Sequence, residues 1–180
     1  MYRSATSNSR LFLAALPDAT TAARIHRLAG LLKRAHNLSG RLITPERLHV
    51  SLFFLGGLQE QLVHSVCEAA ERVRFSPLEV SFDRTASFRG RAGSRPFVLI
   101  GGNGTDQLRS FRQTLAVELT RLGLKRRAKT NFEPHVTLAY DDRSVEEYPV
   151  AQPISWIVNE LVLIHSLTGY RRLASWPLCV

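Results

Sequence analysis

The chain has 180 residues, of which 44% are hydrophobic and 22% are charged. This length and composition are typical of one globular domain and exclude a disordered chain. Lys and Arg number 24 against 15 Asp and Glu, so the formal net charge is +9, which favours a polyanionic partner such as nucleic acid. The alternative that charge alone leaves open is a basic surface without a ligand.

The cysteine content and the distribution of charge favour a cytoplasmic protein. Cys67 and Cys179 are too few for a disulfide framework, so we expect two free thiols. No run free of Asp, Glu, Lys and Arg exceeds 12 residues, which is shorter than a membrane-spanning helix, so we expect no membrane association. Residues 1–9 are polar and are expected to form a flexible tail before a single domain over residues 10–180.

The first half of the domain predicts alternating strands and helices. Residues 10–17 read as a strand that ends at a proline, and Asp18 is placed to cap a helix with apolar residues at helical spacing. A short extended segment over 41–44 ends at Pro45. It precedes an apolar strand over 48–57 and a second amphipathic helix over 59–74.

The second half continues in the same way. Residues 78–88 alternate between apolar and polar, as in a strand with one buried face. The further expected elements are a strand over 96–100, a helix over 105–122, and strands over 134–140, 155–165 and 171–178.

One short motif occurs twice. Residues 48–52 read LHVSL and residues 134–138 read PHVTL, so each copy has a histidine, an apolar residue, a hydroxyl residue and a leucine. The two histidines are 86 positions apart, and each copy lies in an apolar strand with a similar order of elements around it. The duplication suggests two similar lobes, each of which contributes one motif.

Strand geometry predicts where these side chains point. Successive side chains in a strand lie on opposite faces, so His49 and Ser51 share one face, while Val50, Leu52 and Phe54 face the core. The second copy repeats this pattern. Each strand therefore has an apolar face for the core and a polar pair for a cleft.

Two imidazoles and two hydroxyls suit phosphodiester chemistry without a metal or a cofactor. One neutral histidine of the pair His49 and His135 accepts a proton, and the other, when protonated, donates one to a leaving oxygen. The hydroxyls of Ser51 and Thr137 donate hydrogen bonds to phosphate oxygens. A single His-x-Ser is weak evidence and fits an unrelated half-buried histidine equally well. Two copies in matching contexts favour the catalytic interpretation.

Basic and aromatic residues near the second motif are candidate RNA contacts. Arg127 and Lys129 belong to a basic loop that is suited to a phosphate backbone. Phe88 lies within an arginine-rich stretch over 84–95, and Phe132 follows the basic loop over 125–129. Both are candidates for stacking on bases, although core packing explains an aromatic side chain equally well. No group of side chains has the spacing of a metal site.

The two motifs, the opening strand RLFLAALP and the final hairpin resemble the 2H phosphoesterase superfamily. The similarity is greatest to its RNA 2′,3′-cyclic phosphodiesterase or 2′-5′ RNA ligase-like group, and it extends from Arg10 to Leu178. The resemblance implies an α+β, bilobal fold. In that fold two antiparallel sheets flank a central cleft, helices pack outside, and the lobes are duplicated about a pseudo-two-fold axis.

The resemblance also implies hydrolysis of 2′,3′-cyclic phosphate ends of RNA to 2′-phosphates, with weak 2′-5′ joining of RNA ends. It makes His49 the proton donor and His135 the acceptor, with Ser51 and Thr137 as phosphate ligands. We expect an RNA or small cyclic nucleotide substrate and a monomer. The alternatives are another cyclic or 2′-5′ phosphodiester, such as ADP-ribose cyclic phosphate or 2′-5′ oligoadenylate, or a binding module without catalysis.

The sequence departs from the pattern of this group at three positions. Ser51 replaces the more frequent Thr of the His-x-Thr motif and keeps the hydroxyl. Many members have an Arg shortly before the second motif and a basic residue after its Leu, where this chain has Thr130 and Tyr140. Arg127 or Lys129 is a candidate replacement for the first. Tyr140 is itself a candidate RNA contact, and it leaves the identity of the substrate open.

Overall fold

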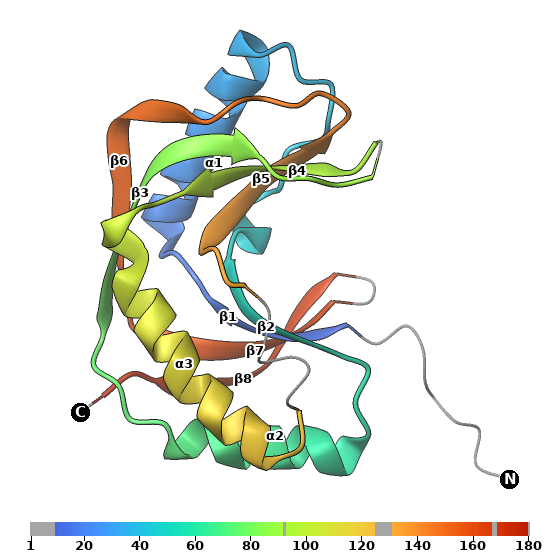
Figure 1. Cartoon of the computed structure of the whole chain (residues 1–180), viewed down its shortest axis with the longest axis vertical. Helices are drawn as coiled ribbons and strands as arrows, with labels where there is room; N and C mark the ends of the chain where they lie inside the picture. The colour runs from blue at the N-terminus through green and yellow to red at the C-terminus, as the bar shows by residue number, and fades with distance from the viewer. Residues whose placement is uncertain (1–9, 92, 125–130, 167–168, 180) are drawn as a thin grey trace, which may run out of the picture.

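The computed structural model shows an α+β fold in which eight strands form one sheet (Figure 1). The strands are β1 (Leu11–Ala15), β2 (Val50–Gly56), β3 (Leu78–Ser87), β4 (Arg95–Ile100), β5 (His135–Asp141), β6 (Tyr148–Val158), β7 (Glu160–Ser166) and β8 (Tyr170–Pro177). The helices are α1 (Ala19–Ala35), α2 (Glu60–Arg72) and α3 (Asp106–Arg121), with short 3-10 turns η1 (Pro45–Arg47) and η2 (Asn103–Thr105). The structure describes residues 10–91, 93–124, 131–166 and 169–179, so the tail expected at 1–9 lies outside it.

The strand order is β6-β3-β4-β5-β2-β1-β7-β8, and every neighbouring pair is antiparallel. The expectation of two separate sheets is therefore wrong, because Val50 of β2 pairs with Val136 of β5 and makes the ladder continuous. This is the one residue pair that the described residues form between β2 and β5. The sheet thus has two halves of four strands, and the two motif strands meet at its centre.

Each half is built around a strand–helix–strand unit whose second strand carries the motif. The units are β1–α1–β2 and β4–α3–β5. Asp18 caps α1 as predicted, since its carboxylate accepts a hydrogen bond from the backbone N–H of Thr21 at 2.9 Å. Helix α1 connects two strands of one half but packs against β5 and β6 of the other. This crossing ties the halves together.

The large core lies between the sheet and the helices. Ile25 of α1, Val66 of α2 and Phe111 of α3 are fully buried in it together with inward-facing strand residues. Two small apolar clusters form around Phe12 and Val98. Among the described residues no helix is long and apolar enough to cross a membrane.

Two strand predictions differ from the structure. The strand predicted over 155–165 is two strands, β6 and β7, which break at Asn159 because the chain crosses there from the outer edge of one half into the other half. Strand β6 is an edge strand, and edge strands tolerate prolines such as Pro149 and Pro153. Because proline is unfavourable inside most strands, the sequence pattern did not predict the first residues of β6.

The prediction for Phe54 is also wrong. The register between β1 and β2 shifts at Leu13/Ala14, so that Leu52 and Phe53 both face the core and Phe54 is 60% exposed. A bulge of this kind inserts one residue and reverses the faces that follow it. Phe54 consequently lies on the same face as Ser51.

A second contact between the halves lies beside the Val50–Val136 pair. Leu42 pairs with Ala139 of β5, and the backbone N–H of Ile43 donates to the carbonyl oxygen of Leu138 at 2.8 Å. The segment predicted to be extended over 41–44 therefore continues along β5 where β2 ends.

A buried carboxylate fixes the approach of this segment. Asp141 is 3% exposed and accepts hydrogen bonds from the backbone N–H groups of Gly40 and Arg143 and from the hydroxyl of Ser39. These bonds lower the pKa of Asp141, the Arg143 bond most of all. Glycine is needed at position 40, because a Cβ there would lie 1.9 Å from the carbonyl oxygen of Tyr140.

We expect Asp141→Asn to lower the free energy of unfolding by about 2 kcal/mol, because the amide turns an N–H toward a backbone N–H and removes the charge-assisted bonds. The measurement is urea unfolding at neutral pH, with Asp83→Asn as the exposed control, which is expected to change stability by less than about 0.5 kcal/mol. The difference between wild type and Asp141→Asn should shrink as the pH falls below 3.8 and through the lowered pKa of Asp141, because the hydrogen bonds stabilise only the ionised carboxylate. Equal losses in the two variants would contradict this role.

Candidate active site

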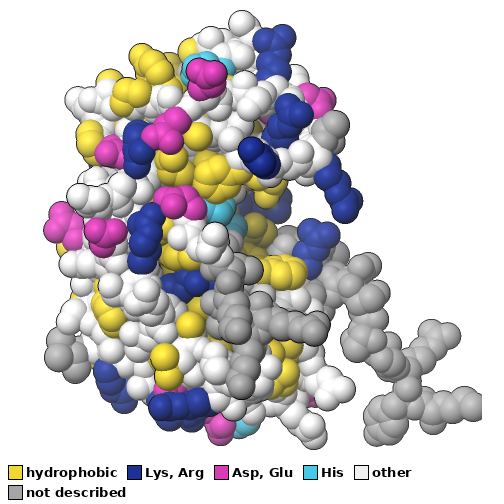
Figure 2. Space-filling model, in the orientation of Figure 1, with side chains coloured by type: hydrophobic (Ala, Val, Ile, Leu, Met, Phe, Trp, Pro, Cys, Tyr) yellow, Lys and Arg dark blue, Asp and Glu magenta, His cyan; other side chains and the backbone are white. Residues whose placement is uncertain are grey.

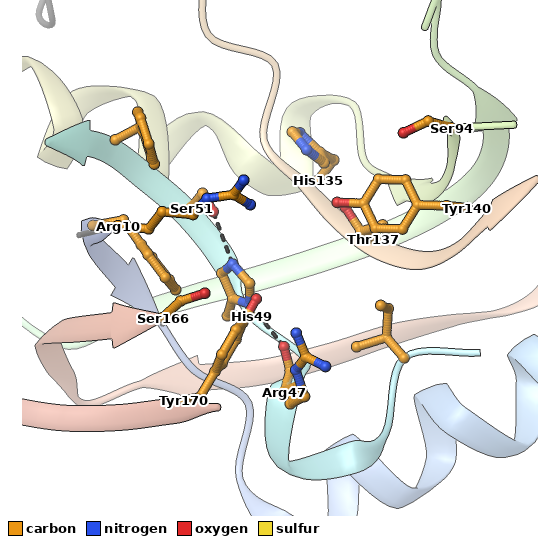
Figure 3. A pocket seen from close by; sticks show the side chains of 13 residues that line it. Arg10, Arg47, His49, Ser51, Ser94, His135, Thr137, Tyr140, Ser166 and Tyr170 are labelled. Atoms are coloured by element: carbon orange, nitrogen blue, oxygen red, sulfur yellow. Dashed lines mark hydrogen bonds between the residues drawn. The ribbon is translucent and has the colours of Figure 1, made fainter. Parts of the chain in front are cut away.

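The two motifs lie on one cavity of about 520 Å³ at the centre of the sheet (Figure 3). His49 and Ser51 of the first motif and His135 and Thr137 of the second all line it. The structure therefore brings together the four residues that the sequence predicted as catalytic and phosphate-binding.

The register of the central pair explains this grouping. Because Val50 lies opposite Val136 in antiparallel strands, His49 is placed across from Thr137, and Ser51 across from His135. Residues one position to either side of a pair point to the opposite face from that pair. The two valines, which are fully buried, thus direct all four polar side chains away from the core.

Hydrogen bonds fix the tautomer of His49. Its Nδ1 lies 2.7 Å from the carbonyl oxygen of Arg47, and its Nε2 lies 2.8 Å from the Ser51 hydroxyl oxygen. Because a carbonyl oxygen only accepts, Nδ1 carries the hydrogen, and Nε2 of the neutral ring has a lone pair toward the cavity. Ser51 then donates its hydroxyl hydrogen to Nε2.

His135 is held in the same way. Its Nδ1 donates to the carbonyl oxygen of Glu133 at 2.7 Å, again two residues before the histidine. The Glu133 carboxylate is paired with Arg109 of α3 at 2.8 Å, which anchors the residue that supplies the carbonyl. Both imidazoles therefore carry the hydrogen on Nδ1 when they are neutral.

Aromatic rings surround both histidines. The ring of His49 lies 4.8 Å from that of Phe12 and 5.3 Å from that of Tyr170, centroid to centroid. The ring of His135 meets the edge of Phe88 at 4.9 Å. These contacts restrict the orientation of each imidazole and cover part of its surface.

Burial lowers the pKa of both histidines, and it is the largest cause in each case. For His49 the carbonyl of Arg47 acts in the opposite direction, while the charges of His135 and Arg47 lower the pKa further. For His135 the carbonyl and the charge of Glu133 oppose the effect of burial. Burial thus favours the neutral form of each imidazole.

The positive charge of the cavity comes from residues that the sequence analysis did not single out. Arg10 and Arg47 line it, and the described residues that line it include no Asp or Glu. Histidine side chains are visible in a recess near the centre of the face in Figure 2, with Lys and Arg side chains around it. Ser94, just before β4, also lines the cavity. Arg47 was within reach of sequence reasoning, because it lies two residues before His49.

The candidate RNA contacts have different positions. Tyr140 lines the cavity, whereas Phe88 packs on His135 and lines a neighbouring hollow. Phe132 lies under the guanidinium of Arg112, 4.6 Å from ring centre to charge, against the main core. The structure therefore gives Phe132 a packing role. Arg127 and Lys129 lie outside the described residues.

The cysteines and the acidic residues form no further site in the described part of the chain. Cys67 and Cys179 are free thiols, as predicted. No group of three or more His, Cys, Asp and Glu side chains is placed to hold a metal ion within residues 10–91, 93–124, 131–166 and 169–179.

Two curated relatives share about one third of their residues with this chain over the matched region. The RNA 2′,3′-cyclic phosphodiesterase of Archaeoglobus fulgidus is 30% identical over 109 residues, which is 60% of each chain. The protein of the same name from Thermotoga maritima is 33% identical over 112 residues, which is 59% of this chain and 54% of the relative. The match thus spans less than two thirds of these relatives.

Solved structures match over a longer span. Escherichia coli LigT, solved in complex with NADP⁺, has a TM-score of 0.76 and 25% identity, with 97% of this chain and all of LigT covered. A structure described as a phosphoesterase has a TM-score of 0.77 and 24% identity over 96% of this chain, and therefore shows the shared fold.

A family model described as the 2′-5′ RNA ligase superfamily matches residues 16–169, which include both motifs and most of the sheet. This span agrees with the resemblance that the two motifs indicate. The chain belongs to the 2′-5′ RNA ligase superfamily.

Proposed function

We propose that this protein is a metal-independent phosphodiesterase that hydrolyses 2′,3′-cyclic phosphate ends of RNA to 2′-phosphates. The observation that carries the proposal is the pair of imidazoles on one cavity, each with its Nδ1 hydrogen bonded to a backbone carbonyl. A hydroxyl residue accompanies each of them two positions further along the strand. The names of the curated relatives from Archaeoglobus fulgidus and Thermotoga maritima support the same reaction.

The proposed mechanism needs one neutral and one protonated imidazole. His135, neutral, accepts a proton from water as the water oxygen bonds to phosphorus. His49, protonated, donates its Nε2 hydrogen to the ribose O3′ as the bond from O3′ to phosphorus breaks. The product has a 2′-phosphate and a 3′-hydroxyl, and exchange with solvent restores both histidines. The direction of transfer follows the family resemblance.

The hydroxyls stabilise the negative charge that develops on the non-bridging phosphate oxygens. Ser51 and Thr137 donate hydrogen bonds to the two non-bridging oxygens, one from each strand. In this proposal each half of the sheet acts as one lobe of a duplicated, two-lobed enzyme and supplies one histidine and one hydroxyl. Weak 2′-5′ joining results when the 5′-hydroxyl of a second RNA replaces water.

Small nucleotides other than RNA ends are a specific alternative substrate class, because Tyr140 and two Arg residues line the cavity. E. coli LigT, which shares this fold, has been solved in complex with ATP and with 3′-AMP. A turnover screen distinguishes the classes by product mapping. Its substrates are a cyclic-phosphate-ended RNA, a nucleoside 2′,3′-cyclic phosphate, ADP-ribose cyclic phosphate and 2′-5′ oligoadenylate.

Replacing either catalytic histidine should nearly abolish turnover. We expect His49→Ala and His135→Ala each to lower kcat by about 10²- to 10⁴-fold on cyclic-phosphate-ended RNA. The assay contains EDTA, which should leave the wild-type rate unchanged. The matched control is His64→Ala on the exposed surface of α2, which should keep wild-type activity. No turnover by wild type in EDTA would refute metal independence, and full activity of both histidine variants would refute the mechanism.

The pH dependence should be bell-shaped with an acidic optimum. Because burial lowers both histidine pKa values below 6.5, the maximum of kcat/KM, which reports on the free enzyme, should lie on the acid side of that value. The bound phosphate anion stabilises an imidazolium, so the bell for kcat should be shifted to higher pH. Initial rates between about pH 4 and 9 test both statements. An optimum of kcat/KM above pH 7 would contradict the first.

The hydroxyl at position 51 should matter more than the identity of its residue. We expect Ser51→Ala to lower kcat by about 10- to 10³-fold, because one donor to the transition state is lost. Ser51→Thr keeps the hydroxyl and should retain most of the activity. Steady-state rates of the two variants make the comparison. Similar losses in both would indicate that packing, and not the hydrogen bond, matters at this position.

A further inference from the structure

A looped-out turn brings Arg47 to the cavity. Nine residues, Leu42 to Val50, lie opposite only four residues of β5, because Leu42 pairs with Ala139 and Val50 with Val136. The excess length forms the 3-10 turn η1, Pro45–Arg47, between the two pairings. A continuous strand has no room for these residues. The turn therefore leaves the plane of the sheet, and its last residue lines the cavity.

The guanidinium of Arg47 lies on an aromatic surface. It is 4.6 Å from the centroid of the Tyr170 ring, which itself packs edge-on against His49. Figure 3 shows Tyr140 reaching into the cavity from β5, above Arg47. Within the described residues no salt bridge involves Arg47, and no acidic side chain lines this cavity. The charge is thus available to an anion.

Arg47 and Arg10 occupy different positions relative to the reaction. The carbonyl of Arg47 binds Nδ1 of His49, while the reacting edge of the ring is Nε2, beside Ser51. Figure 3 shows the guanidinium of Arg10 beside Ser51, and that of Arg47 on the other side of His49. Arg10 is therefore near the phosphate that reacts, and Arg47 is displaced from it by the width of the imidazole.

We propose that Arg47, flanked by Tyr140 and Tyr170, is a specificity residue that binds a second phosphate, the one on the 5′ oxygen of the terminal nucleotide. This proposal rests on the proposed function. A guanidinium presents parallel N–H donors that match two phosphate oxygens, and it keeps this fork while it lies on a tyrosine ring. Tyr140 lines the same cavity as Arg47 and adds a phenol hydroxyl to its polar surface. A nucleoside 2′,3′-cyclic phosphate lacks this second anion.

The structure consequently assigns the cavity to substrates that carry two phosphates, such as the end of an oligonucleotide. It also identifies the source of the positive charge opposite Tyr140. The sequence has tyrosine where many relatives have a basic residue after the second motif, and Arg47 supplies a cation to that side of the cavity from the other half of the sheet.

The test compares two substrates that differ only in the second phosphate. One is adenosine 2′,3′-cyclic phosphate, and the other is the same nucleotide with a 5′-phosphate. Wild type should favour the 5′-phosphorylated substrate by about 10- to 100-fold in kcat/KM, mainly through KM. Arg47→Ala should reduce this ratio to near one. Arg47→Lys should restore part of it, because lysine keeps the charge but not the fork.

Arg27→Ala is the matched control, because it removes the same charge from the exposed surface of α1 and should preserve the ratio. Circular dichroism and thermal unfolding establish that each variant is folded. Turnover of neither substrate by wild type would refute the proposed function. Turnover of both with a ratio near one, or an unchanged ratio in Arg47→Ala, would overturn the second phosphate site alone.

Discussion

The backbone pairing of Val50 with Val136 is the constraint on which both the sheet and the cavity depend. It makes one sheet of two four-stranded halves, and it sets the register of the motif strands. Since both valines are fully buried, their neighbours must face the opposite side of the sheet. The core therefore positions the proposed catalytic groups. A shift of one residue in either strand would turn its histidine and hydroxyl into the apolar interior.

Further contacts between the two halves of the sheet support this pairing. The segment through Leu42 extends the contact with β5, the carboxylate of Asp141 holds that segment in place, and α1 crosses from one half to the other. The histidines are in turn fixed by carbonyl groups and by rings such as Phe12 and Phe88. These contacts hold both imidazole rings in place, and burial by the same rings lowers the pKa of both histidines.

Local periodicity was enough to predict the helices, most strands and the four motif residues, because alternation along a strand and spacing along a helix are properties of neighbouring residues. It failed where pairing decides the outcome. Phe54 changes face through a bulge that only the register with β1 creates. Arg10, just before β1, and Tyr170 of β8 reach the cavity from segments that are distant from the motifs in the sequence and come near them only in the folded sheet. The joining of the two expected sheets also depends on one residue pair, Val50 with Val136, whose members are far apart in the sequence.

The carbonyl that fixes each imidazole belongs to the backbone two residues before the histidine, and every amino acid supplies that group. Acid–base chemistry therefore places no demand on the side chain at position 47 beyond a compatible turn. Single substitutions at this position can therefore change the substrate preference while the reaction is retained. Under the proposed mechanism and substrate preference, one residue combines a fixed function in its main chain with an adjustable one in its side chain, so substrate choice can change without a change in the reaction.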